Sequence, residues 1–584
     1  ESLPGVINSI PWPKNMYWGK PSERFVRPVR WIVAMLDGEV IPFEFDGIRA
    51  GRISRGHRII GEPQVEIGSS LDYANALRRA KVLSSPSRAE QIRQGVNEVL
   101  GAVPGARWRE DKELLHTVVN LTEWPSVILG GFDPQFLALP EEVLVTVMRD
   151  HQKYFAVEDA SGKLLPHFLA VLNTDGDPEG LIRHGNERVL RARFNDAKFF
   201  WETDQKKSLL ERLDLLRNVT FQKDLGSYYE KARRVQRVCS WLSEIVKQSG
   251  MAIRPGVIHK AAALAKTDLT TELVKEFTEL QGIIGGLYAR VQELDPTLPE
   301  ATRLAIADAI YDHYKPESTE DSVPRSTEGA MLSIGDKADT IAGMFALGLV
   351  PSGSKDPFAL RRQANAIVRV IAEKKLPLRL NQLMRDARAG YHGSAAENKF
   401  VDDAMFEESV RTFFHERIEF YLKDVCGYPY DVVKAVLAAG ADDVVDTMSR
   451  AEAVKEVLHM PEFLAIGAAC KRIRNILKQA EEKGIKPTAQ FEYLPNSAPE
   501  EKNLAAFVET EGQKIEENRS KQKYGEALVL LSTAREPVDA FFDKVMVMVE
   551  DDKVRANRLA LLQTLLREFS TIADFSEIVT EGKA

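Results

Sequence analysis

The order of apolar and polar residues divides the chain into a mixed first part and a helical remainder. Up to about residue 185, short β-branched runs alternate with turn residues, a pattern that predicts strands and hairpins. The runs cover residues 31–33 and 117–119, and the turns are expected at Asp37-Gly38, Ala50-Gly51 and Gly130-Gly131. Helices are expected over residues 71–83 and 88–100, with a Ser-Pro-Ser between them. We therefore predict a mixed α/β domain over residues 1–185.

From Asn186 onward the apolar residues keep helical spacing almost to the end, as in the leucines at positions 209, 210, 213 and 216. Polar or proline-containing stretches predict loops at residues 295–299, 315–324 and 349–357. Residues 374–400 mark a boundary, and residues 483–503 interrupt the last helical block. The predicted parts are a helical linker over 186–250, a helical domain over 251–375, a connecting region over 376–405 and a C-terminal helical domain over 406–584.

Composition is that of a multidomain globular protein. The chain has 584 residues, too many for one hydrophobic core, and its 44% apolar and 28% charged residues are ordinary values. The sequence lacks the ~20 uninterrupted apolar residues of a membrane helix. It opens at Glu1 without a charged and then apolar leader, so we expect a fragment or processed chain with a cytoplasmic location. Cys239, Cys426 and Cys470 form no CxxC pair, which favours buried, unreactive thiols.

Charge and motifs restrict the function. Lys and Arg number 78 against 86 Asp and Glu, a net charge of -8. Because phosphate binding needs local positive charge, an RNA surface is expected only as a patch on an acidic body. The sequence contains no GxxxxGK[ST], GxGxxG, HExxH or GxSxG motif, and no HIGH-like, KMSKS-like or Gly-rich, arginine-ended synthetase signature. A catalytic role for this chain is therefore not indicated.

A group of ionisable residues lies on predicted helices of the middle domain: His259, Asp268, His313, Asp336 and Asp339. Phosphohydrolases of the HD type hold a divalent metal on such helices with a histidine, an adjacent His-Asp pair and a distant aspartate. Here Asp268 follows Thr267, and a cation with fewer ligands binds poorly. We expect polar residues at helix ends and core edges and no metal. A metal-dependent phosphohydrolase that uses His259, Asp268, His313 and Asp336 is the alternative.

Four stretches combine positive charge with glycines, amides or aromatic residues. The first, residues 50–58, is a glycine-framed basic loop or strand end that contains Arg55. The second, residues 188–193, contains Arg191 and is equally well explained as a solvated helix face. Arg55 and Arg191 are the candidate RNA contacts of these two stretches.

The third stretch, residues 353–363, predicts the start of a helix. Asp356 is expected as the N-cap and Pro357 as the first helical residue, and the free N–H groups of such a helix end suit a phosphate. The positive charge nearby comes from Lys355, Arg361 and Arg362. An ordinary capped helix with solvated arginines has the same pattern and is left open.

The fourth stretch, residues 470–478, puts Ile473, Ile476 and Leu477 on a buried stripe and leaves its polar residues outside it. A basic helix flank with an amide suits unpaired bases. A related cluster at residues 551–558 precedes an apolar helix over residues 559–566. Either cluster alone fits a solvated face, but the two together favour RNA contact. The candidate residues are Lys471, Arg472, Arg474, Asn475, Arg555, Asn557 and Arg558.

Six segments carry a resemblance to a known family. They are FVRPVRWIVAMLDGEVIPFEFDGIRAGRISRGHR, MRDHQKYFAV, GNERVLRARFNDAKFFWETD, AKTDLTTELVKEFTELQGIIGGLYAR, GLVPSGSKDPFALRRQA and FFDKVMVMVEDDKVRANRLALL. In this order they closely resemble the β subunit of bacterial α2β2 glycyl-tRNA synthetase, from about residue 18 to residue 566. Long matches in register are far more specific than any short motif.

The resemblance implies a mainly α, multidomain fold. It comprises a mixed α/β N-terminal domain, an HD-like helical middle domain that has lost its metal site and a C-terminal DALR-type anticodon-binding domain. It also implies a chain that is non-catalytic alone and binds tRNA(Gly), while a separate class II α subunit attaches glycine with ATP and Mg²⁺. Neither a cofactor in this chain nor a membrane partner is expected. Residues 470–478 and 555–558 would lie near the anticodon and residues 353–363 near the acceptor arm.

One feature departs from the family. Its members usually open with a further α/β segment carrying an EIGTEELP-like motif, which this sequence lacks. We therefore expect an incomplete first domain and leave open how the α subunit docks. A second alternative, besides the phosphohydrolase, is an assembly scaffold whose basic segments only keep it soluble.

Overall fold

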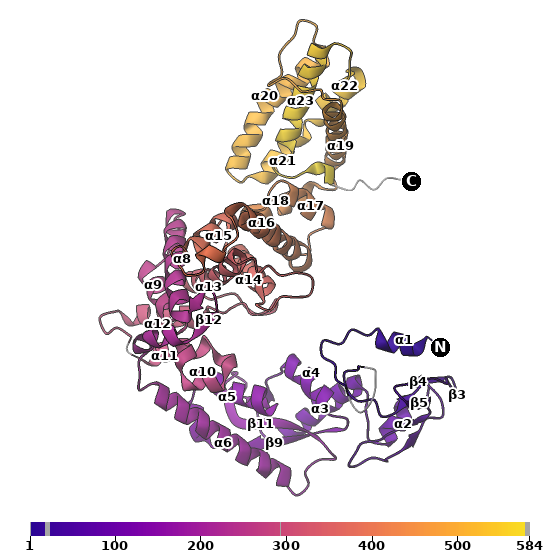
Figure 1. Cartoon of the computed structure of the whole chain (residues 1–584), viewed down its shortest axis with the longest axis vertical. Coiled ribbons are helices and arrows are strands. Elements are labelled where there is room, and N and C mark those ends of the chain that lie inside the picture. Colours follow the sequence, from indigo (N-terminus) through magenta and orange to yellow (C-terminus); the bar gives the residue numbers. More distant parts are fainter. Residues whose placement is uncertain (1, 18–23, 293, 578–584) are drawn as a thin grey trace. The chain divides into compact units, whose positions relative to one another are not determined.

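The computed structural model describes residues 2–17, 24–292 and 294–577, and the chain separates into two units (Figure 1). The first unit comprises Glu1–Lys206 and Glu272–Leu280, and the second comprises Lys207–Thr271 and Gln281–Ala584. The point near residue 18 where the family resemblance begins lies outside the described residues. The five-part division expected from the sequence stays a prediction.

A four-stranded antiparallel sheet in the order β8-β10-β11-β9 forms the centre of the first unit. Its longest pair joins β9 (Pro125–Gly131) to β11 (Leu164–Asn173). Two helices, α3 (Ser85–Leu100) and α4 (Lys112–Leu121), contribute to the core that also includes residues of β10 and β11. This apolar contact between helices and sheet is the main driving force for folding this unit.

The remaining strands of the first unit are short. In a three-stranded sheet, β1 pairs in parallel with β5, and β5 pairs antiparallel with β4. The strands are β1 (Ile32–Val33), β2 (Met35–Leu36), β3 (Glu39–Val40), β4 (Glu44–Phe45), β5 (Ile48–Gly51), β6 (Ile53–Ser54), β7 (Val65–Glu66), β8 (Arg107–Trp108) and β10 (Phe155–Glu158). The other helices are α1 (Leu3–Asn8), α2 (Tyr73–Arg79), α5 (Glu141–Thr146), α6 (Leu181–Asp204) and α10 (Glu272–Glu276), with short helical turns at Pro134–Ala138, Val147–Gln152 and Thr278–Leu280.

Two glycine pairs expected to form turns lie in strands. Ala50-Gly51 ends β5, and Gly130-Gly131 ends β9. At Gly130 a Cβ would lie 2.2 Å from the ring of Phe168 on the neighbouring strand. The residue is a glycine because the Phe168 ring covers it, which is a recognised reason for glycine within a strand.

Other local predictions had mixed outcomes. The turn at Asp37-Gly38 is confirmed, because it joins β2 to β3 in a hairpin with Leu36 opposite Glu39. Residues 117–119 were expected as a strand but lie in α4, where Val118 and Val119 are buried in the core. Packing of their side chains outweighs the strand preference of β-branched residues. The Ser-Pro-Ser lies inside the first turn of α3, a position that proline tolerates.

The middle part of the second unit is built around one central helix. All residues of α13 (Thr327–Ala346) after the first are buried, and α8, α9, α12, α14 and α15 pack around it. Small residues permit this packing, since a Cβ at Gly343 would lie 2.3 Å from the Tyr391 hydroxyl. Because the helix is enclosed on every side, its polar residues Asp336, Lys337 and Asp339 lie in the interior of the protein.

The expected loops at residues 295–299, 315–324 and 349–357 separate α11, α12, α13 and α14. The helices of this part are α7 (Leu209–Arg212), α8 (Tyr228–Gln248), α9 (Pro255–Leu264), α11 (Ile283–Val291), α12 (Glu300–Asp312), α14 (Leu360–Lys374), α15 (Leu380–Ala389), α16 (Asp403–Phe420), α17 (Tyr430–Ala438) and α18 (Val444–Val457). Two strands, β12 (Thr220–Gln222) and β13 (Gly226–Ser227), form a hairpin, and short helical turns lie at Leu213–Asn218, Thr267–Thr270, Glu397–Lys399, Tyr421–Val425 and Phe575–Glu577.

The C-terminal part is a bundle of α19 (Pro461–Glu482), α20 (Pro499–Ser520), α21 (Tyr524–Ser532), α22 (Arg535–Lys544) and α23 (Asp552–Phe569). The expected polar interruption is the segment between α19 and α20. Inside the bundle α23 packs against α19 and α20. The buried Arg450 of α18 donates to the carbonyls of Val436 and Ile572, which ties the end of the bundle to α17 and α18.

The cysteine prediction holds for two of the three thiols. Cys239 and Cys470 are buried, and burial raises the pKa of Cys470 to about 12. Cys426 is exposed, contrary to the expectation that all three are buried. Among the described residues, no helix combines the length and the apolar character needed to cross a lipid bilayer.

Candidate nucleic-acid interface

The outer face of α19 carries the first group of expected RNA contacts. Ile473 is buried, and Arg472 and Asn475 are exposed, as the helical spacing predicts. The Arg472 guanidinium lies 4.2 Å from the centroid of the Phe542 ring, which fixes its direction. Lys471 is half-buried and already engaged within the chain.

Arg474 is held by residues near the C-terminal end of the described chain. Its guanidinium pairs with Asp574 and lies 3.9 Å from Glu577, yet 44% of the side chain is exposed. Burial acts to raise the pKa of Asp574, but hydrogen bonds from Arg474 and Ser576 outweigh it and leave this pKa lowered. Arg474 is therefore a fixed cation with one side open to solvent.

The second group, at the start of α23, points inward. Asn557 is buried, accepts from the Glu492 N–H and donates to the Glu492 carbonyl. Arg558 donates to the buried carboxylate of Glu501 and to the Met546 carbonyl. Arg555 donates to the Val549 carbonyl and pairs with Asp552. These side chains fasten α23 to the loops around it, so Asn557 has no free polar atom to offer a base.

A cavity lies between α19 and α23. It has a volume of about 480 Å³ and is lined by Leu477, Leu559 and Leu566 together with the polar residues Arg474, Lys478, Glu481, Lys486 and Gln563, of which three are cations and one is an anion. Lys478, Lys486 and Gln563 are exposed, and the two lysines make no ion pair with any described residue. An apolar recess with free donors at its rim suits a flat polar ring such as a nucleobase.

Sequence reasoning missed part of this cavity. Lys486 falls in the segment that was classed only as a polar interruption, and Gln563 falls in a helix classed only as apolar. The signal for Gln563 was its position four residues after Leu559, which places both on one helix face. Lys486 had no local signal, since a loop brings it to the cavity.

The third stretch begins its helix later than expected. Asp356 accepts hydrogen bonds from Leu360 N at 2.8 Å and Arg361 N at 2.9 Å, so it does cap α14. Pro357 lies outside the helix, because Ala359 adopts a left-handed conformation with φ 52°. The Asp356 carboxylate already occupies the first N–H groups, which corrects the expectation of a free phosphate site there. Lys355 and Arg362 are exposed and Arg361 is half-buried.

The two arginines of the first unit are both exposed. Arg55 lies just after β6, with its guanidinium 5.4 Å from the centroid of the half-exposed Trp31 ring. Arg191 lies on the outer face of α6, where its neighbour Arg193 pairs with Glu276 at 3.4 Å. A cation stacked on an aromatic ring near the surface is one form of contact that single-stranded RNA uses.

The expected metal-ligand positions do not form one group. His259 is exposed on α9, whereas Asp268, His313 and Asp336 are buried in the interior, not at the core edge as expected. Asp268 accepts from Gly282 N and Gly285 N and so caps α11. Burial raises the pKa of Asp268 to about 6.

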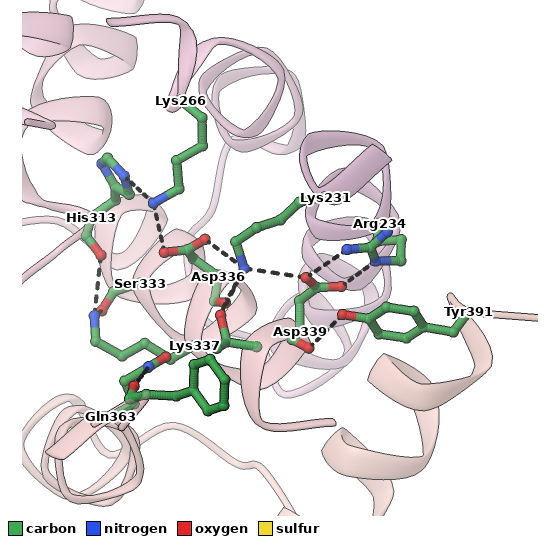
Figure 2. A network of polar contacts seen from close by, with 12 residues as sticks. Lys231, Arg234, Lys266, His313, Ser333, Asp336, Lys337, Asp339, Gln363 and Tyr391 are labelled. Carbon is green, nitrogen blue, oxygen red and sulfur yellow. Dashed lines mark hydrogen bonds and ion pairs between the residues drawn. The ribbon is translucent and has the colours of Figure 1, made fainter. Parts of the chain in front are cut away.

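Two lysines lie among these residues (Figure 2). Lys266 Nζ is 2.9 Å from His313 Nε2 and 2.8 Å from Asp336 Oδ2. Lys231 Nζ is 3.1 Å from Asp336 Oδ1 and 3.2 Å from Asp339 Oδ2. We call these side chains, together with two neighbouring cations, the α13 cluster: Lys231, Arg234, Lys266, His313, Asp336, Lys337 and Asp339.

The α13 cluster fixes protonation states. Burial lowers the pKa of His313 far below its ordinary value, and the neighbouring Lys266 lowers it further. The neutral ring donates from Nδ1 to the Ile310 carbonyl and accepts from Lys266 at Nε2. Burial acts to raise the pKa of Asp336, but Lys231 and Lys266 outweigh it, and the carboxyl stays ionised.

This donor set does not fit a divalent metal. The ammonium groups of Lys231 and Lys266 contact both oxygens of Asp336, and metal ligands must be unprotonated and free to bind. Within the described part of the chain, no three His, Cys, Asp or Glu side chains gather in a way that would hold a metal ion. The arrangement pairs opposite charges inside the fold.

Comparison with known families identifies the class of protein. A family of DALR anticodon binding domains matches residues 466–575, which contain most of α19, all of α20 to α23 and every residue of the cavity. Such a domain is a part of aminoacyl-tRNA synthetases, so the chain is of that class. The family described as glycyl-tRNA synthetase beta subunit matches residues 1–438.

Full-length relatives agree with this assignment. The glycine--tRNA ligase beta subunit of Acidobacterium capsulatum is 54% identical over 591 residues, which covers 99% of this chain and 81% of that protein. Those of Syntrophus aciditrophicus and Desulfatibacillum aliphaticivorans are 40% and 38% identical, over 100% and 99% of this chain and 81% of each relative. The chain belongs to the glycyl-tRNA synthetase beta subunit family. The resemblance seen in the sequence is confirmed.

Proposed function

We propose that this chain binds tRNA(Gly) and positions it so that a separate α subunit attaches glycine. Membership of the family and the DALR domain support the ligase role and an RNA partner. The observation that carries the proposal is the cavity between α19 and α23, with its free cations, on an otherwise acidic chain. On an acidic body, such local positive charge is what an RNA needs.

The cavity gives the anticodon loop two kinds of contact. Leu477, Leu559 and Leu566 form an apolar surface for an unstacked base, and the Gln563 amide provides a donor and an acceptor for a base edge. Lys478 and Lys486 at the rim bind phosphates. The exposed Arg472 and Asn475 on the same helix extend this surface along α19.

The acceptor arm is assigned to the region where α14 starts. Lys355 and Arg362 are exposed there and Arg361 is half-buried, so their charges reach solvent. Since Asp356 occupies the helix N-terminus, the side chains and not the backbone N–H groups would bind phosphates. Arg55 and Arg191 of the first unit are proposed as further RNA contacts.

Catalysis is assigned to the partner. In this proposal the α subunit binds ATP and Mg²⁺ and forms the glycyl-adenylate, within an α2β2 complex in the cytoplasm. This chain contributes the orientation of the tRNA 3′ end, which accelerates transfer by proximity. Aminoacylation of tRNA(Gly) should require both chains, and this chain alone should not exchange pyrophosphate with ATP. Exchange by the isolated chain would refute the division of labour.

A binding experiment tests the anticodon site directly. The double variant Lys478→Ala/Lys486→Ala should weaken tRNA(Gly) binding and reduce the slope of log K against log salt by about 2, because two phosphate contacts are lost. The double variant Lys514→Ala/Lys521→Ala is the matched control, because it removes the same charge from α20 and the residue that follows it, where both lysines pair with glutamates. Binding is measured by fluorescence anisotropy at several salt concentrations.

A third variant separates base recognition from charge. Gln563→Ala should weaken tRNA(Gly) by ~1–3 kcal/mol and reduce its preference over a tRNA with another anticodon. It should leave the salt slope unchanged, because it removes no charge. If neither the lysine pair nor Gln563 affects binding more than the control does, the cavity is not the anticodon site, and a scaffold role becomes the better account.

A further inference from the structure

A second cavity opens beside the α13 cluster, far from the DALR domain in sequence. It has a volume of about 330 Å³, within the range of sites that bind small molecules. Its walls come from β12, α8, α13, the start of α14 and the loops beside α9 and α12. The proposed tRNA contacts on α19 do not line it.

The walls carry more positive than negative charge. Three cationic side chains line the cavity, Lys231, Lys266 and Arg362, against the carboxylates of Asp336 and Glu317. Lys337 also lines it, but burial lowers its pKa to about 7, so it is only partly charged at neutral pH. Asp339, which balances Lys231 and Arg234, lies behind the wall. The excess favours an anionic ligand.

Two of these cations have donors left for a ligand. Lys266 Nζ uses two of its three hydrogens on His313 and Asp336. It also lies 3.7 Å from the centroid of the Tyr314 ring, so only a weak cation–π contact competes with a ligand for the third. The Arg362 guanidinium makes no hydrogen bond or ion pair with any described residue and lies at the exposed side of the cavity. A buried ammonium and a free guanidinium facing one cavity can bind a phosphate from two directions.

The other two lysines are occupied. Lys337 Nζ donates to the carbonyls of His313, Tyr314 and Lys315, and Lys231 is bonded to Asp336, Asp339 and Thr340. Their charges still act across the cavity without contact. Lys231 therefore strengthens the positive potential, Lys337 does so in part, and Lys266 and Arg362 supply the direct bonds.

Aromatic rings form the rest of the wall. They are Phe221, Tyr228, Tyr314 and Phe358. The Phe221 and Tyr228 rings meet edge to face with centroids 5.4 Å apart, so they are fixed in place. Aromatic faces beside a phosphate-binding cation are the combination that binds a nucleotide, since the base stacks while the phosphate is neutralised.

We propose that this cavity is a nucleotide site that binds a nucleoside monophosphate, with Lys266 and Arg362 on the phosphate and the aromatic wall against the base. The nucleotide is either free or the terminal unit of an RNA. The proposal does not depend on the anticodon site, and each is tested by its own variants.

The test uses the full chain without the α subunit and titrates AMP by isothermal calorimetry. AMP should bind at least about tenfold more tightly than adenosine, a difference of about 1.4 kcal/mol. Arg362→Ala should weaken AMP about ten- to a hundredfold, the effect of losing a charged hydrogen bond. Lys374→Ala is the matched control on the same helix, outside the cavity lining, and should leave AMP binding unchanged.

Two further arms complete the design. Lys266→Met keeps the length of the side chain without its charge and should abolish AMP binding, with circular dichroism as the check on folding. Displacement of AMP by tRNA(Gly) identifies an RNA end as the occupant, and simultaneous binding identifies a free nucleotide. The proposal is overturned if AMP gives no binding up to ~10 mM, or if Arg362→Ala and Lys266→Met both bind AMP like the parent chain.

Discussion

Asp336 is the residue on which the interior of the second unit most depends, and Asp336→Asn is the sharpest test. Its carboxylate is 6% exposed and lies 2.8 Å from Lys266 and 3.1 Å from Lys231. Asparagine keeps the shape but leaves two buried ammonium groups with less counter-charge and turns an N–H₂ group toward one of them. Breaking a buried pair in this way costs about 3–5 kcal/mol.

The pH of the measurement follows from the pKa of Asp336, which is lowered in the folded chain. The stabilisation by a carboxyl with a lowered pKa is complete above its unfolded pKa and is lost as the pH falls through the folded pKa. At pH 7 the whole effect is present. Because a chain with several parts does not unfold in one step, amide hydrogen exchange of α13 peptides is the suitable assay. We expect exchange to be about 100- to 3,000-fold faster, since each 1.4 kcal/mol is tenfold.

Two controls make the result interpretable. Asp424→Asn removes the same charge from an exposed site and should change stability by no more than about 0.5 kcal/mol. The double variant Lys266→Met/Asp336→Asn restores the charge balance, so its α13 exchange should be slower than in Asp336→Asn alone, by a coupling of about 0.5–3 kcal/mol. If α13 exchanges in Asp336→Asn as it does in the parent, the cluster does not hold this interior together.

Two other predictions concern single side chains. Asn557→Ala removes both hydrogen bonds to the Glu492 backbone and should lower the free energy of unfolding of the C-terminal bundle by about 1–3 kcal/mol. Urea unfolding measures this change. The slope of log K against log salt for tRNA binding should stay the same. The variant Asp268→Asn should become more stable than the parent chain as the pH rises from 4 to 7. The reason is that burial raises the pKa of the Asp268 carboxyl to about 6, so the ionisation of this carboxyl opposes folding. The gain at pH 7 should reach about 2–3 kcal/mol, and a gain independent of pH between these values would contradict the burial argument.

Local sequence signals predicted those parts of the fold that local contacts decide. Asp37-Gly38 forms a two-residue hairpin turn, and the buried Ile473 follows from helical spacing. The prediction of a strand at residues 117–119 was wrong because β-branched side chains fill a core equally well from a helix. The prediction of a turn at Gly130-Gly131 was wrong because Gly130 is covered by the ring of Phe168. Phe168 lies on another strand, and no local pattern indicates this contact.

The candidate site likewise has a part that the sequence could predict and a part that it could not. The exposed residues of α19 could be predicted, because helix periodicity alone decides which side is outside. The inward direction of Asn557 could not, since its partner Glu492 is 65 residues away and is reached only through the packing of the bundle. The charge clusters in the sequence therefore pointed to two helices that line one cavity, α19 and α23, but could not separate side chains that face solvent from those bonded within the protein. Their contacts with RNA stay a prediction.

The α13 cluster shows how the chain itself can neutralise a buried carboxylate. A divalent cation would bring a charge of +2 to Asp336 and its neighbours, and the ammonium groups of Lys231 and Lys266 together bring the same charge. Because both are tethered to the chain, they cannot dissociate, and the histidine beside them stays neutral by accepting from Lys266. A tethered charge cannot activate water as a bound metal ion does. The same two lysines that exclude metal chemistry thus leave the cavity beside them positively charged, which is the property that a phosphate group requires.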